Sequence, residues 1–260
     1  MENISISPDV VFFILGFIPI TSSHIALFFI TMALTLISVY FYLTASLVPT
    51  GLQVVLEGVY EWFMEKASAA FPDQKRAERA LALIMTFFLV IIFANLFGLL
   101  PIINSIVVHL SSGQAVSLFH TPTSHLSMTL AFTLITLTIT HVTALMIKPL
   151  KYIGNFFKIG GILKARSFGG FAKAILEFLL GLLDIVGEIA KLISLSCRLF
   201  GNVLAGELMV VVIMSLTVAT QFIFPMPFII LGIVSGIIQA IVFSLLSLNY
   251  ISLAMASVEE

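Results

Sequence analysis

The sequence predicts an all-α integral membrane protein with about five spanning helices, an interfacial amphipathic helix and a long, tilted final helix pair. Of the 260 residues, 60% are hydrophobic and 10% are charged, and the mean hydropathy is +1.18. A soluble domain of this size needs more polar residues to cover its surface. Apolar runs of spanning length also recur along the chain. We therefore expect residues 1–260 to form a single membrane domain.

The first three predicted segments differ in how their apolar residues are arranged. Prolines interrupt the apolar run of residues 1–22, which is too short to span, and we expect an outer interfacial segment. Residues 24–47 are uncharged and long enough for a spanning helix. Residues 53–70 carry a glutamate at every fourth position opposite an apolar face, which is typical of an amphipathic helix on the membrane surface. These acids are Glu57, Glu61 and Glu65.

Four further membrane helices are predicted from the remaining apolar runs. They cover residues 80–100, 127–147, 171–220 and 228–255. The third of these is anomalous, because about 50 helical residues rise by about 75 Å, whereas the hydrocarbon core of a bilayer is about 30 Å thick. This helix must therefore tilt steeply, bend or project from the membrane.

The distribution of basic residues predicts the orientation of the chain. The loops 66–79 and 148–173 hold ten of the twelve Lys and Arg residues, and the N-terminus and the 101–125 loop hold none. By the positive-inside rule, the N-terminus faces the outside and the C-terminus faces the cytoplasm, with five spans between them.

The composition argues against several other classes of protein. With a formal net charge of -1 and few basic residues, the chain has no nucleic-acid-binding pattern. A single cysteine, Cys197, excludes an internal disulfide. We expect neither a metal ion nor another cofactor.

The long helix at 171–220 places one arginine, Arg198, in an apolar region. A charge at the centre of a bilayer costs about 3 kcal/mol or more, so its default interpretation is functional, usually as part of an ion pathway. Arginine keeps its proton inside proteins, and Arg198 can therefore act as a fixed positive charge but not as a proton carrier. The alternative is an arginine that reaches the lipid headgroups or pairs structurally with a carboxylate.

Helical geometry sorts the other polar residues of this segment into two groups. At 100° per residue, one polar stripe runs from the inner end toward mid-membrane. It contains Glu177, Asp184, Glu188, Lys191, Arg198 and Asn202. Glu207 points to the opposite face and lies about 13.5 Å further outward than Arg198. The pattern predicts two polar access routes with a positive barrier between them, although Glu188 and Lys191 also fit a simple ion pair on the helix surface.

Residues 194–207, with the sequence SLSCRLFGNVLAGE, resemble the signature of subunit a of the F-type ATP synthase, the membrane stator that faces a rotating ring. Shorter similarities occur at residues 95–101, 239–243 and 250–255. The resemblance implies a proton-translocating stator subunit that is not catalytic alone. Its implied partners are the c-ring, the peripheral-stalk b subunits and the lipid bilayer. A bacterial inner membrane is the expected location, with a mitochondrial or thylakoid membrane as the alternative.

The resemblance also implies roles for individual residues. Arg198 would face the carboxylates of the ring, with Asn202 and Gln239 near it. Glu207 would belong to the outer half-channel. Asp184 and Glu188 would lie toward the inner half-channel.

The chain departs from its relatives at two positions that could carry protons. Some relatives have an acid where Gly98 stands and a histidine near Gly232. The candidates to replace them at the mouth of the outer channel are His24, His120 and His125, with solvated loop histidines as the alternative. His141, inside the span 127–147, is interpreted as a packed polar residue, with a proton relay as the alternative.

The spacing of the last two helices does not by itself bring Arg198 close to Gln239. A simple hairpin folded at residues 225–227 would place Arg198 opposite a residue well beyond Gln239. Their proximity would then require an irregular connection or a steep crossing of the two helices.

Two other functions remain open at this point. A self-contained secondary ion transporter would carry inverted internal repeats, and no convincing second copy of the Arg198 motif occurs in the sequence. A purely structural membrane subunit would use its charges only to bind its partners.

Overall fold

The computed structural model describes residues 10–14, 18–49, 51–98, 107–109, 115–117, 119–156, 168–216 and 224–259. The elements are β1 (Val10–Ile14), β2 (Ile18–Thr21), α1 (Ser22–Thr44), α2 (Leu52–Ala70), α3 (Gln74–Gly98), β3 (Val107–His109), β4 (Ala115–Ser117), the 3-10 helix η1 (Pro122–Ser124), α5 (Leu126–Ile147), α6 (Pro149–Phe156), α8 (Phe168–Leu216) and α9 (Pro225–Glu259). Long helices dominate, so the predicted all-α membrane fold class is confirmed.

Two short antiparallel hairpins accompany the helices in the described part of the chain. β1 pairs with β2 directly before α1, and β3 pairs with β4 before η1. The predicted outer segment 1–22 therefore contains a hairpin in its described part, while residues 1–9 and 15–17 lie outside the described residues. Residues 99–100 and 217–220, at the ends of two predicted spans, lie outside them as well.

Among the described helices, α1, α3, α5 and α9 are long and apolar enough to cross a membrane. α3 begins at Gln74, six residues before the predicted span, because the charged residues that precede the apolar run continue the helix. α8 is a single helix of 49 residues, and α9 has 35. At 1.5 Å per residue, α8 is about 74 Å long, more than twice the thickness of a bilayer's hydrocarbon core.

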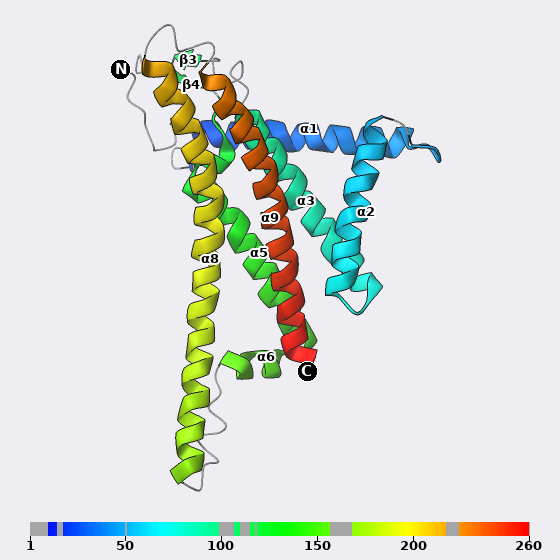
Figure 1. Ribbon diagram of the computed structural model, residues 1–260, viewed down its shortest axis with the longest axis vertical. Coiled ribbons are helices and arrows are strands. Elements are labelled where there is room, and N and C mark those ends of the chain that lie inside the picture. Colours follow the sequence, from blue (N-terminus) through cyan, green and yellow to red (C-terminus); the bar gives the residue numbers. More distant parts are fainter. Residues whose placement is uncertain are drawn as a thin grey trace.

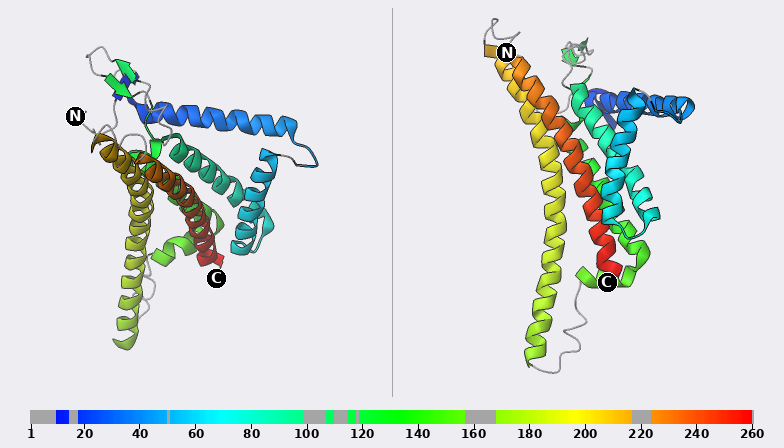
Figure 2. Two further views of the ribbon diagram at one scale, coloured as in Figure 1. Left: turned by 45° about the horizontal axis from the view of Figure 1, so that its top comes forward. Right: turned by 45° about the vertical axis from the view of Figure 1, so that its right-hand side comes forward.

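The helices do not all run in one direction. α3, α5, α8 and α9 extend along the long axis of the molecule, and α1 lies across them (Figures 1 and 2). α1 has 23 residues and is about 35 Å long, which fits an upright crossing of the membrane. Since α8 runs crosswise to α1, both helices cannot stand upright. An upright α1 leaves α8 and α9 steeply tilted, as their lengths also require.

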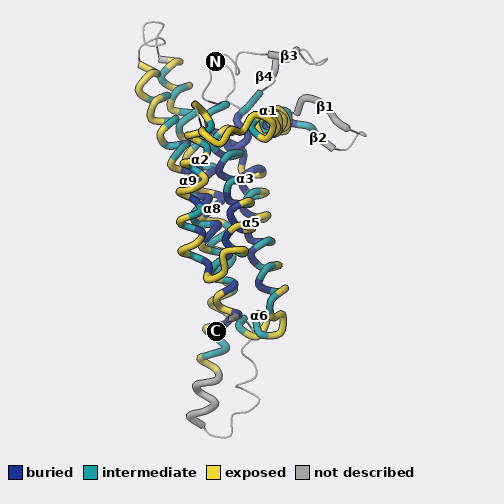
Figure 3. The backbone as a smooth tube through the Cα atoms, turned by 90° about the vertical axis from the view of Figure 1, so that its right-hand side faces the viewer, coloured by how far each residue is buried: buried dark blue, intermediate teal, exposed yellow. Residues whose placement is uncertain are grey.

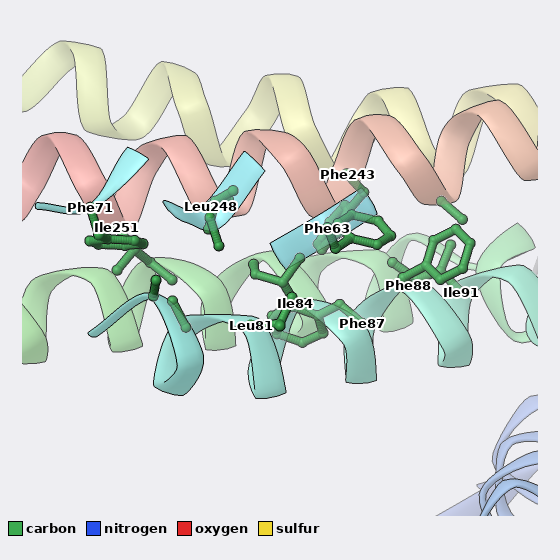
Figure 4. Packing of buried hydrophobic residues seen from close by; sticks show 14 of the residues in the cluster. Phe63, Phe71, Leu81, Ile84, Phe87, Phe88, Ile91, Phe243, Leu248 and Ile251 are labelled. Atoms are coloured by element: carbon green, nitrogen blue, oxygen red, sulfur yellow. The ribbon is translucent and has the colours of Figure 1, made fainter. Parts of the chain in front are cut away.

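α9 lies at the centre of the packing and contacts α3, α5 and α8. Apolar residues of α3 recur every three or four positions and form one buried face. Aromatic rings from several helices meet there (Figure 4), with Phe87 5.7 Å from Phe243 and Phe63 5.1 Å from Phe88 between ring centroids. On α8, the side chains of Leu195 and Leu199 are fully buried in the same core. This packing fixes the rotation of α8 at the level of Arg198.

Large apolar side chains also cover much of the outside of the molecule. α1 is exposed along most of its length (Figure 3). The outward face of α8 carries a row of leucine, isoleucine and valine side chains. Exposed apolar surface of this extent is typical of a protein that contacts lipid or partner helices.

Candidate functional site

α8 carries Glu188, Arg198 and Glu207 at three separate levels. Ten residues separate Glu188 from Arg198 and nine separate Arg198 from Glu207, which correspond to about 15 Å and 13.5 Å along a helix. The helix is unbroken over this region, so the spacing is rigid. The two carboxylates therefore lie on either side of the arginine along the axis of α8.

Arg198 is exposed and faces away from the core. Its Nη2 atom donates a hydrogen bond to the Ser194 hydroxyl over 3.4 Å. Among the residues that the structure describes, no carboxylate oxygen lies within 4.0 Å of its guanidinium group. Arg198 therefore presents an unneutralised positive charge on the outer surface of α8.

Glu207 is turned inward, with 18% of its side chain exposed. The Thr121 hydroxyl donates a hydrogen bond to its Oε1 atom, and His120 Nε2 lies 4.0 Å from its Oε2 atom. Thr121 precedes η1 and packs directly against Gly98 of α3, where a Cβ atom would overlap its side chain. The glycine thus allows η1 to approach closely enough for Thr121 to reach the carboxylate.

A cavity of about 210 Å³ opens beside Glu207 between α3, α8 and α9. Its polar lining residues are Asn95, Asn202, Glu207 and Ser235. The Ser235 hydroxyl donates to Asn202 Oδ1 over 2.8 Å. The rest of the lining is apolar, and the four polar side chains supply the hydrogen-bonding groups that a water molecule beside Glu207 needs.

The sequence did not single out Asn95 as a site residue, although it is a lone amide within an apolar helix. Its Nδ2 atom donates to the Gly236 carbonyl oxygen over 3.1 Å, and its Oδ1 atom accepts a hydrogen bond of 2.6 Å from Thr123. Asn95 thereby joins α3, η1 and α9 at the wall of the cavity. An isolated polar side chain in a spanning helix was the signal that could have identified it.

The predicted reversal of the chain at residues 225–227 is wrong. Pro225 is the first residue of α9, because the first turn of a helix tolerates proline. The reversal therefore lies between Leu216 and Pro225. The hydrogen bond between Asn202 and Ser235 then sets the register of the antiparallel pair α8–α9.

This register brings Arg198 and Gln239 to the same level without an irregular crossing. Arg198 lies one helical turn before Asn202, and Gln239 lies one turn after Ser235. Gln239 is 4% exposed, and its buried Nε2 atom has no hydrogen-bond partner in the described part of the chain.

Glu188 forms the ion pair that the sequence left as an alternative. Its Oε1 atom accepts a hydrogen bond of 2.7 Å from Lys191, whose ammonium group lies 5.2 Å from the centre of the Tyr250 ring. Its Oε2 atom lies 3.9 Å from His141 Nε2 on α5. Asp184, one turn earlier on α8, is exposed. The tertiary fold therefore groups Glu188 with residues of α5 and α9.

The two loop histidines differ in their surroundings. His120 has 42% of its side chain exposed, whereas His125 is 5% exposed and is therefore not a solvated loop residue. Their ring centroids are 5.0 Å apart. Burial, with added repulsion from His120 and His24, lowers the pKa of His125 to about 4. His125 is therefore neutral at physiological pH, and only His120 lies close to Glu207.

Comparison with known proteins covers all of these residues. A family model described as ATP synthase A chain matches residues 23–252. ATP synthase subunit a 1 of Hahella chejuensis is 28% identical over 246 residues, which are 95% of this chain and 89% of that protein. ATP synthase subunit a of Moorella thermoacetica is 32% identical over 208 residues, or 80% and 78%. The subunit of Desulfotalea psychrophila is 31% identical over 202 residues, or 78% and 69%.

Proposed function

This chain belongs to the ATP synthase A chain family, and from that premise we propose that it offers two offset proton half-channels to the carboxylates of a rotating c-ring, separated by Arg198. It is a non-catalytic, multi-pass membrane subunit of the ATP synthase. The observation that carries the proposal is the position of Arg198. The residue is an exposed cation without a carboxylate partner in the described chain, and Glu188 and Glu207 lie on opposite sides of it.

The exposed apolar face of α8 around Arg198 is the surface that the ring would contact. Ala205 and Met209, seven and eleven residues after Arg198, lie within about 20° of it around the helix and are exposed. A ring carboxyl group approaching through this apolar environment is neutral, because an unpaired carboxylate is costly there. When the ring carboxylate lies opposite Arg198, the positive charge of the guanidinium group stabilises its negative charge. The same positive charge repels protons and prevents direct leakage from one half-channel to the other.

The outer half-channel is proposed to run through the cavity that Glu207 lines. Asn202 lines this cavity. Gln239 is not part of the lining, and its buried amide lies one turn of α9 beyond Ser235, toward the level of Arg198. His120 lies at the exposed side of Glu207, where it can exchange protons with water. Protons entering this route reach the ring carboxylate on the outer side of Arg198.

The inner half-channel is proposed to include Glu188 and Asp184. Asp184 lies exposed toward the inner end of α8, one turn before Glu188. A ring carboxyl group would release its proton into this route, pass Arg198 as an anion and regain a proton from the outer route, or the reverse. Moving one elementary charge across the membrane releases about 2.3 kcal/mol for each 100 mV of membrane potential.

We place the chain in a bacterial inner membrane, with the N-terminus outside and the C-terminus in the cytoplasm. The bacterial relatives and the basic connection that contains α6 support this placement. The c-ring and the peripheral-stalk b subunits are the proposed protein partners. A cysteine introduced at exposed Ser257, in a Cys197→Ser background, should react with a membrane-impermeant maleimide only from the cytoplasmic face, and labelling from the outside would reverse the orientation.

Replacing Arg198 with Ala tests the function. We expect proton-driven ATP synthesis to be lost and passive proton leak through the membrane sector to rise, since the fixed charge between the routes is gone. Cys197→Ser is the matched control, because the neighbouring Cys197 is equally exposed and unbonded. Both variants are measured in vesicles that contain the assembled complex. Full coupled synthesis in the Arg198→Ala variant would contradict the proposal.

The same vesicles separate this function from the two other candidates. The purified chain alone should conduct almost no protons, because the route is completed only by the ring carboxylates. Substantial flux through the chain alone would indicate a secondary transporter. Normal coupled synthesis in variants of both Arg198 and Glu207 would indicate a purely structural subunit.

A further inference from the structure

Three side chains from three helices form a connected chain at the inner end of the molecule. His141 of α5 lies between Tyr152 of α6 and Glu188 of α8. The Tyr152 hydroxyl and His141 Nδ1 are 2.6 Å apart, and His141 Nε2 is 3.9 Å from Glu188 Oε2. Tyr152 belongs to the basic connection between α5 and α8. The group therefore lies between that connection and the polar stripe of α8.

The neighbours of His141, Tyr152 and Glu188, favour one position for the proton of the neutral imidazole. Burial, together with the nearby Glu188 carboxylate, raises the pKa of Tyr152 to about 12, so the phenol keeps its proton. A phenol can donate to Nδ1 or accept from it, and the Glu188 carboxylate 3.9 Å from Nε2 favours a hydrogen on Nε2, so we infer that the phenol donates to Nδ1. A neutral imidazole that accepts at Nδ1 carries its hydrogen on Nε2. That N–H group is on the side of the ring nearest Glu188.

Glu188 has one oxygen without a partner. Lys191 donates to its Oε1 atom, whereas its Oε2 atom is buried and has no hydrogen-bond partner among the described residues. Leaving a buried carboxylate oxygen without a hydrogen bond is energetically unfavourable. A small rotation of either side chain would close the 3.9 Å distance to the His141 N–H group. Because Lys191 occupies Oε1, Oε2 is the one atom of Glu188 that is free to receive a proton.

We propose that Tyr152, His141 and Glu188 form a proton-exchange site, in which His141 passes protons between the inner aqueous phase and the Glu188 carboxylate. This inference rests on the proposed function, since it supplies the entry to the inner half-channel. His141 is suited to the task because one third of its side chain is exposed. Tyr152 is a positioning residue that acts through His141.

The transfer conserves protons at every step. The imidazole takes up one proton from water at Nδ1, and the Tyr152 hydroxyl turns from donor to acceptor. The imidazolium then gives its Nε2 proton to Glu188 Oε2, which leaves a neutral imidazole and a neutral carboxylic acid. Exchange with water restores the tautomer with hydrogen on Nε2. The reverse sequence carries a proton from Glu188 to the inner phase.

The titratable groups around this site determine how its charge changes with pH. Lys191 and Glu188 come from α8, Tyr152 from α6 and Tyr250 from α9, where its ring lies against Lys191. Neither tyrosine nor lysine changes charge between pH 5 and pH 8 under ordinary conditions, whereas imidazole does. Removing the imidazole should therefore lower the rate of proton conduction and also remove the dependence of that rate on pH.

Proton conduction through the assembled membrane sector, measured in inside-out vesicles, tests the site. His141→Gln keeps a polar side chain of similar length, and we expect conduction to fall about tenfold and to lose its pH dependence between pH 5 and pH 8. His141→Ala should fall similarly, and imidazole added to the medium should restore conduction. In Tyr152→Phe, conduction should fall about twofold, because the phenol no longer helps to hold the His141 hydrogen on Nε2. Tyr60→Phe, on the exposed face of α2, should conduct normally.

Two outcomes would overturn the proposal. The first is His141→Gln conducting at the wild-type rate or with the wild-type pH profile. The second is a loss in His141→Ala that imidazole leaves unchanged, which would assign His141 a packing role. Arg198→Ala in the same vesicles keeps the two proposals distinguishable. Loss of coupled synthesis in that variant, with normal conduction in His141→Gln, would reject only the proton-exchange site.

Discussion

The carboxylates of Glu207 and Glu188 are carried by the same helix but are surrounded in opposite ways. Glu207 has a threonine hydroxyl and a nearby histidine as neighbours, beside a mainly apolar cavity. Glu188 is held by the ammonium group of Lys191, three residues further along α8. A hydroxyl group leaves the charge of a carboxylate in place, whereas an ammonium group neutralises it. The free-energy cost of keeping the carboxylate charged is therefore higher for Glu207 than for Glu188.

Under the proposed function, this difference would allow one continuous helix to serve two half-channels. In the proposed function, Glu207 itself exchanges protons at the outer end, where no cation of α8 lies within a helical turn of it. At the inner end, Glu188 is already paired with Lys191, and the proposed exchange involves His141 on a neighbouring helix. Arg198 lies between the two carboxylates along α8, and in the proposed function its charge keeps the two routes apart.

Replacing each acid with glutamine tests this contrast most strongly. We expect Glu207→Gln to lower proton-driven ATP synthesis by at least about a hundredfold, because the outer route loses its exchanging group. Glu188→Gln should lower it about tenfold, because Asp184 and water remain on the inner side. Glu57→Gln, on the exposed face of α2, is the control and should be normal. A larger loss for Glu188→Gln than for Glu207→Gln would reverse the comparison.

The positions of the helices could be predicted from the sequence because hydropathy is a local property. The apolar runs gave α1, α5 and α9 to within three residues at their N-terminal ends. The 100° spacing along α8 placed Glu207 on a different face from Arg198, and in the structure Glu207 turns inward while Arg198 is exposed.

The partners of the site residues could not be predicted, because they are distant in the sequence. Thr121 and Glu207 are 86 residues apart, and Asn95 and Gly236 are 141 residues apart. No helical period relates such pairs, and only the packing of α3 and η1 on α8 and α9 brings them together. Pro225 misled the prediction in another way, since proline can either break a helix or begin one.

Gly98→Ala should disturb the contacts around Glu207 while leaving the Glu207 carboxylate in place. The added methyl group would overlap the Thr121 side chain, so η1 must move away from α3 and the hydrogen bond to Glu207 is lost. We expect ATP synthesis to fall about fivefold and the thermal stability of the complex to fall by about 1–3 kcal/mol. Gly58→Ala is the control, because a Cβ atom there meets nothing within 4 Å. Unchanged synthesis in Gly98→Ala would separate Thr121 from the function of Glu207.

The smallest expected effect concerns His125. This residue is expected to affect the pH dependence of stability at the outer end, and not proton transfer. Its pKa is about 4 in the fold, against an ordinary value of 6.5, because burial and the neighbouring His120 and His24 disfavour the charged form. The stabilisation is therefore complete above about pH 6.5 and is lost as the pH falls toward 4, by roughly 3 kcal/mol. The inner end has no buried histidine of this kind among the described residues, since His141 is one-third exposed.

His125→Gln should accordingly flatten the fall in thermal stability of the purified membrane sector between pH 6.5 and pH 4. It should leave ATP synthesis at neutral pH nearly unchanged, because His125 is already neutral there. His120→Gln is the informative partner variant, since His120 lies closer to Glu207 and should affect synthesis more than stability. A His125→Gln variant that kept the full pH dependence of stability would mean that other groups at the outer end bind the protons, and the burial of His125 would then explain nothing about acid sensitivity.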